Sequence, residues 1–397
     1  GMRVAHNDAE CRDGFVRASN EARSCCGDDR MFAEKFIEEP RHIEIQIIAD
    51  SFDNIVDLNE RECSLQRRHQ KVIEEAPSPF LDEKTRQQMG EQAVALARAV
   101  NDHSAGTAEF IVDSQRNFYF LDMNTRLQVE HPVTEMITGF DLVELMIRVA
   151  NGEKLPIAQS DVSINGWAIE ARVYAEDPSR NFLPSTGRLI HYRPPANDEN
   201  VRVDTGVFEG GEVSMFYDPM IAKLITHGVD REAATAHMRA ALDRFLIKGV
   251  SHNISFLSAL MVNPRFVSGA MSTNMIGEEY PDGFQPTDLS HQDPSIFISV
   301  AASMMRGYRD RAAQIDGQLT GHERRVPNDW VVVMNKEHHP VSVIGTQGGH
   351  DVQYNGHTYA VRSRWEFGQP IFSGTINGEE IFVQVLRQDQ DYRLIHG

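Results

Sequence analysis

The segment from Phe118 to Pro132 constrains the fold more than any other part of the chain, because polar and apolar side chains alternate along it. In an extended backbone this alternation sends the two sets of side chains to opposite faces of a strand. One face would then pack into a core while the other carries polar chemistry. The polar set is Asp122, Asn124, Arg126, Gln128 and Glu130, and the apolar set is Leu121, Met123, Leu127 and Val129.

A second strand is predicted over residues 108–113, joined to the first by a tight turn at 115–116. This hairpin would place Glu109 directly opposite Asp122, with Cβ atoms roughly 5 Å apart. Two like charges at that distance repel each other unless a cation lies between them. Carboxylates and the amide oxygen of Asn124 suit Mg²⁺ carrying substrate phosphates, so these three residues are candidate metal ligands. A solvated strand face is the alternative interpretation.

Two upstream segments favour the interpretation with a metal and an anion. Residues 41–50 alternate as a strand, with Ile43, Ile45 and Ile47 toward a core and His42, Glu44 and Gln46 on a polar face. Residues 63–77 then place four cationic side chains within five positions, a suitable lining for an anion site. These are Arg67, Arg68, His69 and Lys71. Alone, such a cluster is usually a solvated surface.

Together these segments closely resemble the ATP-grasp domain of biotin carboxylases. The matching strings are Glu34–Phe36, Pro40–Gln46, Gln66–Val72, Ala105–Thr107 and Met123–Glu135. Further strings resemble the C-terminal domain of that family: Gly166–Pro178, Phe182–Ser185, Arg202–Asp204 and Phe216–Ile225. The residues from Tyr280 onward resemble the α subunits of propionyl-CoA carboxylases. The resemblance covers essentially the whole chain.

The resemblance implies an α+β fold in three parts. Residues 1–136 would be the C-terminal part of an ATP-grasp domain, and residues 137–275 a biotin carboxylase C-terminal domain. Residues 276–397 would begin the domain that links biotin carboxylase to carboxyltransferase, a helix plus an antiparallel β-barrel or sheet. We expect both ends to be truncated relative to the family, with a nucleotide-binding half upstream and a biotin-attachment motif downstream.

Local signals place several elements in this scheme. A helix is predicted from about Asp82 to Val100, and Asp141 with Glu144 predicts a capping box for another. An alanine-rich helix is expected over residues 231–245, and Asp293-Pro294 would start one that reaches about Ile315. Beyond residue 329, short strands are separated by glycine turns that are strong hairpin signals. These turns are Gly348-Gly349, Asn355-Gly356 and Asn377-Gly378.

The resemblance also implies a role for each candidate site residue. Glu109, Asp122 and Asn124 would hold Mg²⁺ or Mn²⁺, and Lys71, Arg126, Gln128, Val129 and Glu130 would bind bicarbonate. ATP would contact Met2, Glu34, Lys35, Ile37, His42, Gln66 and His69. Among the catalytic residues Lys71, Arg126, Glu130 and Arg202, Glu130 would be the base and Arg202 the cation facing biotin. The family has Glu where Asp122 stands, which shortens one ligand and puts the metal geometry in question.

The expected activity is carboxylation of biotin by ATP and bicarbonate through carboxyphosphate, within an acyl-CoA carboxylase α subunit. The chain as given is expected to be inactive by itself, because most of the family's phosphate loop and its ATP-binding lysines would lie upstream of Gly1. The cofactors would be ATP, Mg²⁺ or Mn²⁺, and biotin on a carrier domain outside this chain. An alternative is an incomplete, inactive fragment that only assembles with a carboxyltransferase β subunit. A third is another ATP-grasp ligase, such as one that makes carbamoyl phosphate, which the string Arg202–Asp204 and the β-rich tail disfavour.

Composition limits the partners. The net charge of −19 argues against nucleic acid, whose phosphates require a basic surface. The sequence has no apolar run of the roughly 20 residues that span a membrane. Four cysteines without CxxC spacing indicate neither a disulfide framework nor a zinc site. We expect carboxyltransferase β subunits and a biotin carrier domain as partners, an oligomer, and a bacterial cytoplasm or mitochondrial matrix.

Overall fold

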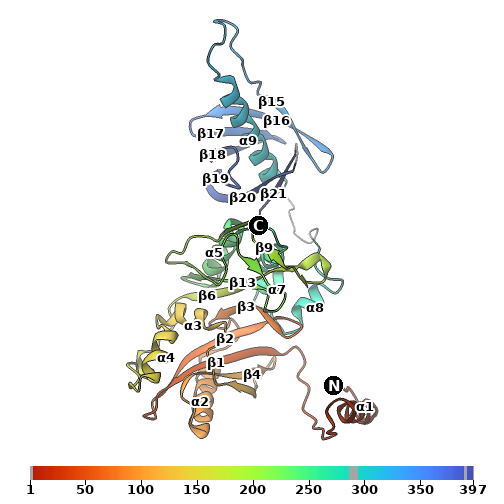
Figure 1. Ribbon diagram of the computed structural model, residues 1–397, viewed down its shortest axis with the longest axis vertical. Coiled ribbons are helices and arrows are strands. Elements are labelled where there is room, and N and C mark those ends of the chain that lie inside the picture. Colours follow the sequence, from red (N-terminus) through yellow and green to blue (C-terminus); the bar gives the residue numbers. More distant parts are fainter. Residues whose placement is uncertain (1–2, 286–293, 389–390, 397) are drawn as a thin grey trace.

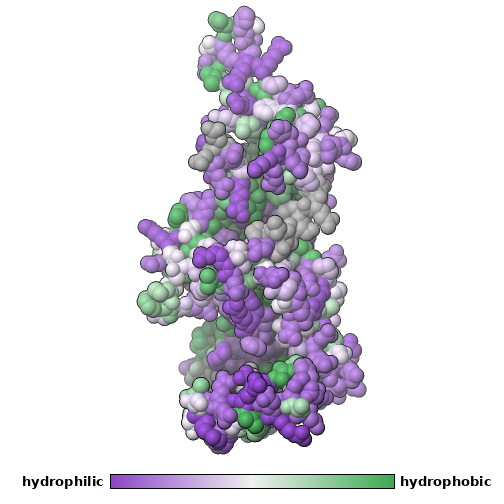
Figure 2. All heavy atoms as spheres, turned by 90° about the vertical axis from the view of Figure 1, so that its right-hand side faces the viewer, coloured by the Kyte–Doolittle hydropathy of each residue, from purple (hydrophilic) through white to green (hydrophobic). Residues whose placement is uncertain are grey.

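The computed structural model describes residues 3–285, 294–388 and 391–396. Its long axis separates a large sheet with flanking helices from a curled sheet that contains the last strands, as Figure 1 shows. Helix α1 (Asp8–Cys26) lies at the N-terminal end, apart from the large sheet. The surface is predominantly hydrophilic on the face in Figure 2. None of the described helices combines the length and apolarity needed to cross a bilayer.

The large sheet has eight strands in the order β11-β13-β6-β3-β2-β1-β4-β5, and all of its neighbours pair antiparallel. Its strands come from both sides of the domain boundary predicted at residues 136–137, because β3 pairs with β6. The two predicted domains therefore share one hydrogen-bonded sheet. The strands are β1 (Arg41–Ala49), β2 (Ile55–Arg67), β3 (Gln70–Ala76), β4 (Ser104–Val112), β5 (Phe118–Asn124), β6 (Trp167–Tyr174), β11 (Val201–Thr205) and β13 (Met220–Gly228).

Helices cover both faces of β1. The isoleucines at 43, 45 and 47 pack against Met89, Ala93 and Ala97 of α2 (Glu83–Val100) in one core. Ile48 joins β2 residues and α4 (Leu142–Ala150) in another. The polar face predicted for β1 is consequently buried as well, since all nine residues of the strand are buried.

The predicted helix start at Asp82 and the predicted cap Asp141 are confirmed, although the Glu144 side chain accepts from Arg148 rather than completing a capping box. Asp82 accepts a hydrogen bond from the backbone of Thr85 at the start of α2, and Asp141 accepts one from the backbone of Glu144 at the start of α4. The prediction of a single extended run from 118 to 130 is wrong. Strand β5 stops at Asn124, and α3 (His131–Thr138) begins with a proline in its first turn, which fixes a backbone angle suited to a helix start.

The remaining elements of the middle region form a second layer over β6 and β13. Helices α5 (Arg231–Arg244) and α6 (Ile254–Val262) share a core with these strands. Short helices α7 (Pro264–Val267) and α8 (Met275–Glu279) follow. Three short pairs complete the region: β7 (Glu176–Asp177) with β8 (Leu183–Pro184), β9 (Gly187–Arg188) with β12 (Glu212–Val213), and β10 (His191–Arg193) with β14 (Leu246–Lys248).

The last strands form a seven-stranded meander curled against α9 (Ser295–Ala313), as predicted from the hairpin signals. The predicted cap Asp293 lies outside the described residues. All three predicted glycine turns join neighbouring strands, and a fourth turn at Asn335-Lys336 was not predicted. The strands are β15 (Asp329–Met334), β16 (Glu337–Thr346), β17 (Gly349–Tyr354), β18 (His357–Ser363), β19 (Ile371–Ile376), β20 (Glu379–Gln388) and β21 (Asp391–Ile395).

Candidate active site

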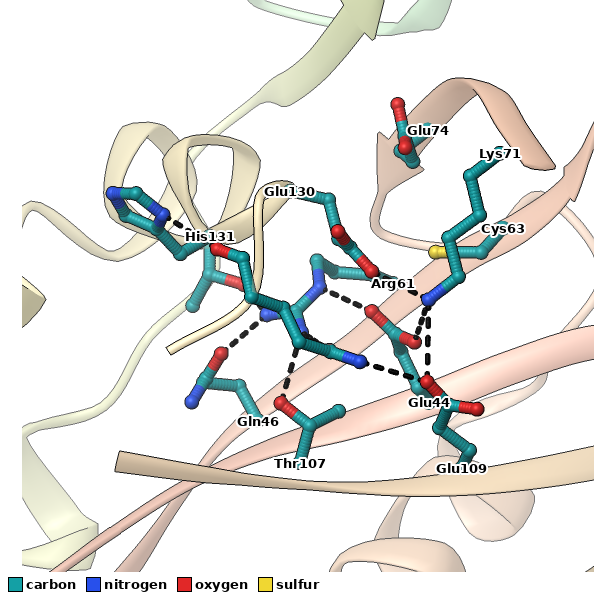
Figure 3. A network of polar contacts seen from close by, with 12 residues as sticks. Glu44, Gln46, Arg61, Cys63, Lys71, Glu74, Thr107, Glu109, Glu130 and His131 are labelled. Carbon is teal, nitrogen blue, oxygen red and sulfur yellow. Dashed lines mark hydrogen bonds and ion pairs between the residues drawn. The ribbon is translucent and has the colours of Figure 1, made fainter. Parts of the chain in front are cut away.

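Lys71 on β3 lies at the centre of a cluster of buried carboxylates (Figure 3). Its Nζ lies 2.7 Å from Glu44 Oε2 and 3.3 Å from Glu109 Oε1, and it also contacts Glu130. Burial alone would lower the pKa of Lys71, but the surrounding carboxylates outweigh burial and raise that pKa above its usual range. The ammonium is therefore held charged at physiological pH.

Arg61 on β2 lies beneath this cluster and is fully buried. Its Nε donates to Glu44 Oε1 at 2.7 Å. Its Nη atoms donate to Gln46 at 2.6 Å, Gln128 at 2.8 Å, Thr134 at 3.0 Å and Thr107 at 3.2 Å. This one guanidinium thus connects β2 to β1 and β4, to helix α3, and to the loop between β5 and α3. Arg61 was not predicted as a site residue, because charged residues occur on both faces of β2 and no periodicity distinguishes it.

A second arginine, Arg172 on β6, contacts Glu130. Arg172 Nη2 donates to Glu130 Oε2 at 2.8 Å, and its Nε donates to Glu74 Oε1 at 2.6 Å. Burial raises the pKa of Glu74 to about 7, although Arg172 opposes that rise. Arg172 was not predicted as a site residue either. Only its place inside the matching string from Gly166 to Pro178 could have marked it.

Glu170 lies beside this arginine on β6 and directly opposite Glu74 on β3. It is completely buried. Within the described part of the chain, neither of its carboxylate oxygens has a hydrogen-bond partner. Burial, reinforced by Glu74, raises the pKa of Glu170 well above its usual range.

The predicted metal ligands meet where β4 pairs with β5. Glu109 lies opposite Asp122, as predicted from the hairpin. Asn124 Nδ2 donates to Glu109 Oε1 at 3.1 Å, which leaves the second oxygen of Glu109 facing His42 at 3.4 Å. Three oxygen-bearing side chains on one hairpin fit a hard divalent cation.

His42 adds to this corner of the site. Its buried Nε2 lies 3.4 Å from Glu109 Oε2 and 3.6 Å from Glu44 Oε2, and its Nδ1 is 3.1 Å from the side chain of Gln66. Burial alone would lower the pKa of His42, but Glu109 and Glu44 raise it to about 9. His42, Glu44 and Glu109 offer ligand atoms within 4.8 Å of one another. Glu44 was assigned only to a polar strand face and is in fact central to the site.

The loop between β5 and α3 supplies the predicted bicarbonate residues. Gln128 Nε2 donates to Glu109 at 2.7 Å, and the carbonyl of Val129 accepts from Lys223 Nζ at 2.9 Å. Glu130 is buried at the start of α3. Arg126 is exposed, with its guanidinium 3.4 Å from Asn124 Oδ1. Gln128 therefore contacts Glu109 and Glu130 contacts Lys71, whereas Arg126 approaches Asn124 and Val129 contacts Lys223.

Arg202 on β11 is held by two carboxylates, and its role toward biotin stays a prediction. Its guanidinium donates to Glu135 at 2.6 Å and to Asp204 at 2.8 and 2.9 Å. Lys223 connects Asp204 to the carbonyl of Val129. These contacts connect Arg202 to the residue before Glu130 only through Asp204 and Lys223, whereas Arg172 contacts Glu130 directly.

The cationic cluster at 67–71 does not line a single anion site, which corrects that prediction. Arg68 and His69 occupy the tight turn between β2 and β3 with positive φ angles, so neighbouring side chains diverge. Arg67 pairs with Glu176, Arg68 donates to Asn181, and His69 is exposed. Lys71 is the member that enters the carboxylate cluster.

The predicted adenine-side residues Glu34, Lys35 and Ile37 lie outside helices and strands, between α1 and β1. Lys35 Nζ approaches the ring of Tyr119 on β5, 5.7 Å from its centroid. Met2 lies outside the described residues. The structure thus places this segment beside the hairpin that carries Glu109 and Asp122.

Comparison with protein families divides the chain into three parts. Residues 1–158 match the ATP-binding domain of the carbamoyl-phosphate synthase L chain, and residues 170–278 match the biotin carboxylase C-terminal domain. Residues 297–397 match the propionyl-coenzyme A carboxylase BT domain.

The curated relatives include propionyl-CoA carboxylase α chains. That of Ruegeria pomeroyi is 52% identical over 99% of this chain, and the mitochondrial one of Homo sapiens is 49% identical over 98%. The chain spans 61% and 54% of the length of these two relatives.

Solved structures agree with the curated relatives. The biotin carboxylase domain of a thermophilic 2-oxoglutarate carboxylase bound to bicarbonate has a TM-score of 0.68 and 43% identity, covering 70% of this chain and 62% of that one. A biotin carboxylase complex from Campylobacter jejuni has a TM-score of 0.65 and 46% identity, covering 70% of this chain and 61% of that one. The chain therefore carries biotin carboxylase domains followed by a propionyl-coenzyme A carboxylase BT domain, and it is similar over nearly its whole length to propionyl-CoA carboxylase α chains.

Proposed function

We propose that the protein carboxylates biotin with bicarbonate and ATP, through carboxyphosphate, as the biotin carboxylase component of a propionyl-CoA carboxylase. One observation carries the proposal: Lys71 and Arg172 both contact the buried carboxylate of Glu130, beside the Glu109 and Asp122 pair. The arrangement combines cations for anionic reactants, a base, and ligands for a divalent metal within one site.

Bicarbonate and carboxyphosphate are anions, so their site needs fixed positive charge. Lys71 and Arg126 supply it, with Gln128 and the backbone of Val129 as further polar contacts. A preorganised cation costs little reorganisation when charge develops in the transition state. The buried position of Lys71 strengthens this effect, since water screens it poorly.

Glu130 is the proposed base that removes the proton from the biotin ureido nitrogen. Its two carboxylate oxygens are held from opposite sides by Lys71 and Arg172. These contacts fix its orientation, as a general base requires. We propose Arg172 as the cation next to this base and keep Arg202, the residue indicated by the sequence, as the competing candidate.

Glu109, Asp122 and Asn124 would hold Mg²⁺ or Mn²⁺, which when bound supplies positive charge to the phosphates of ATP. His42, Gln66 and His69 would lie toward the phosphates and ribose. Glu34, Lys35 and Ile37 would lie toward adenine, with Met2 near the phosphates. Asp122 and Glu109 are directly opposite each other on β5 and β4, so metal coordination here should depend strongly on the length of each side chain.

Residues 297–397 support a partnership with carboxyltransferase β subunits, because this region matches the propionyl-coenzyme A carboxylase BT domain. Biotin would arrive on a carrier domain, and the assembled protein would be an oligomer. The bacterial and mitochondrial relatives favour a bacterial cytoplasm or a mitochondrial matrix.

The inactive assembly fragment is less favoured, because the cluster around Lys71 is complete in its charged partners. ATP cleavage that depends on both bicarbonate and free biotin tests the proposal, with Glu130→Gln as the matched variant. Dependence on both substrates that Glu130→Gln abolishes would support it. ATP cleavage that does not depend on biotin would favour another ATP-grasp ligase. If no ATP is cleaved, the assembly role is favoured.

A further inference from the structure

Two buried carboxyls lie behind the proposed base, and the mechanism above does not use them. Glu74 on β3 and Glu170 on β6 are directly opposite each other in an antiparallel pair, and both have 0% exposure. Cβ atoms at such positions are roughly 5 Å apart. Two ionised carboxylates at that distance, without water, would repel strongly.

The hydrogen-bond partners of the pair are unequal. Glu74 Oε1 accepts from Arg172, whereas Glu74 Oε2 and both oxygens of Glu170 have no partner among the described residues. A buried carboxylate without donors is far more costly than a buried carboxylic acid. The pair therefore holds a proton, with Glu170 as its principal site and Glu74 as the member that faces the arginine.

Charged groups on every neighbouring element fit this assignment. On β3 and β2, Lys71 and Cys63 lie on the same side as Glu74 and contribute to its environment. On β13, Lys223 approaches Glu170, but its ammonium bonds to Asp204 and to the carbonyl of Val129.

Helix α3 offers no compensating cation to Glu170. It contributes Val133 and Ile137 to the apolar cluster around Ala168 of β6. Its titratable side chains bond elsewhere, because His131 contacts the carbonyl of Gln128 and Glu135 accepts from Arg202.

We propose that Glu74 and Glu170 form a proton-sharing dyad that positions Arg172 and thereby sets the charge state of Glu130. Arg172 joins the two, since its guanidinium donates to Glu74 at 2.6 Å and to Glu130 at 2.8 Å. With one proton on the dyad, one negative charge remains on Glu74 and one on Glu130, and Arg172 together with Lys71 balances the two. Glu74 and Glu170 are positioning residues. The inference deepens the proposed function and depends on it for the role of Glu130.

The protonation of Glu170 can be measured without any activity. NMR of the chain labelled with ¹³C-glutamate would show the carboxyl carbons. The signal of Glu170 is identified as the one that is absent in Glu170→Gln. In the parent, this signal should keep the chemical shift of a protonated carboxylic acid above pH 7. Unfolding gives a second reading. The folded chain keeps a proton that the unfolded chain releases, so Glu170→Gln should gain stability over the parent by up to about tenfold in the unfolding constant per pH unit above pH 5.

Glu60→Gln is the matched control. Glu60 is equally buried, but its carboxylate accepts from Arg86 and from the backbone of Ser78. It should lose stability, and its difference from the parent should not widen in the stabilising direction as pH rises. A titration of Glu170 below pH 6, or a loss of stability in Glu170→Gln like that of Glu60→Gln, would overturn the dyad.

The link to Glu130 is tested by the pH–rate profile of biotin-dependent ATP cleavage. Glu74→Gln removes a negative charge from Arg172, so the acid limb should move to lower pH, by about one unit, while Glu60→Gln leaves it in place. An unmoved limb in Glu74→Gln would overturn the positioning role. If the parent shows no biotin-dependent cleavage, the proposed function fails, and the carboxyl titration still decides whether the dyad holds its proton.

Discussion

The centre of the eight-stranded sheet and the C-terminal meander are both antiparallel sheets packed against helices, yet they bury opposite chemistry. In the large sheet, His42, Glu44 and Gln46 are all buried on one face of β1. In the meander, the strands bury residues such as Val343 and Val361 against α9. Antiparallel strand geometry therefore does not determine whether the core beside a sheet is charged or apolar.

The two cores also differ in what they contribute to stability. Burying aliphatic side chains stabilises a fold directly, whereas buried ion networks often contribute little net stability and are strongly destabilised when one partner is removed. The charged side chains in the core of the large sheet are therefore better explained by a catalytic role than by a contribution to stability. Five substitutions test this difference between the charged core and the apolar core, and they are given in decreasing order of expected effect.

Arg61→Met should have the largest effect. It leaves Glu44 with one cation fewer and removes donors from Gln46, Gln128 and two threonines. Loss of one partner from a buried ion pair costs about 3–5 kcal/mol, and we expect turnover to disappear as well. Urea unfolding measures the loss. The control Arg148→Met breaks an exposed pair with Glu144 and should change stability by less than about 0.5 kcal/mol; similar losses in both variants would contradict the contrast.

Ile298→Ala tests the apolar core. Ile298 is fully buried on α9 against the meander, and truncation of such a side chain costs about 2–5 kcal/mol. We expect the loss to be confined to the C-terminal part, with ATP cleavage retained at a temperature where that part still folds. Unfolding followed by tryptophan fluorescence reports it, because Trp330 and Trp365 pack against the same cluster. A parallel loss of ATP cleavage would show that the two cores are energetically coupled.

Arg172→Ala separates the two candidate cations. Because Arg172 contacts Glu130 directly, its loss should lower biotin-dependent turnover by about 10²–10³-fold, the scale expected for one preorganised charge contact. Arg202→Ala, which breaks contacts to Glu135 and Asp204, should have the smaller effect. Steady-state ATP cleavage with saturating biotin measures both. The reverse order would restore Arg202 to the role that the sequence indicated.

His252, a partly buried histidine, should differ from His42 in its effect on stability as pH changes. Burial lowers the pKa of His252 to about 4, whereas carboxylates raise that of His42 to about 9. Because the folded pKa of His252 is depressed, the unfolded chain binds its proton first as pH falls. Stability should therefore decline between pH 6.5 and 4, by about 3 kcal/mol at pH 4. His252→Gln should lose less stability over that range in thermal melts; identical pH dependences would refute the assignment.

Asp122→Glu should have the smallest effect. The longer side chain reaches further toward Glu109 across the strand pair, so the Mg²⁺ concentration for half-maximal ATP cleavage should fall several-fold, since Mg²⁺ demands near-ideal geometry. Glu109→Asp, which shortens the opposite ligand, should raise that concentration. Superimposable Mg²⁺ titrations of the parent and Asp122→Glu would show that the shorter ligand is harmless.

Local signals in the sequence predicted much of this fold. The helix start at Asp82, the cap Asp141 and the glycine turns of the meander were predicted correctly, because hydrogen bonds between near neighbours determine them. The pairing of Glu109 with Asp122 followed from a single short hairpin, which fixes register. The end of β5 at Asn124 could not be predicted from alternation, because polar and apolar residues continue to alternate through the loop up to Glu130. The helix that follows, with Pro132 in its first turn, is what prevents one continuous strand.

The deeper half of the site depends on contacts between distant segments. Arg61 and Arg172 became recognisable only when β2 and β6 were placed beside Glu44 and Glu130. No periodicity within either strand distinguishes these arginines from surface residues. The same applies to Glu170, whose lack of partners is a property of the packed sheet rather than of its own neighbours in sequence.

The pairing of β3 with β6 limits how such chains can exchange parts by recombination. A crossover near residue 137 would join a β3 from one parent to a β6 from another, across a pair that carries Glu74 opposite Glu170. A mismatch there would leave a lone buried charge, and a missing β6 would open a strand edge that invites aggregation. Exchange after α8 keeps the sheet whole, so viable hybrids should inherit residues 41–228 as one block.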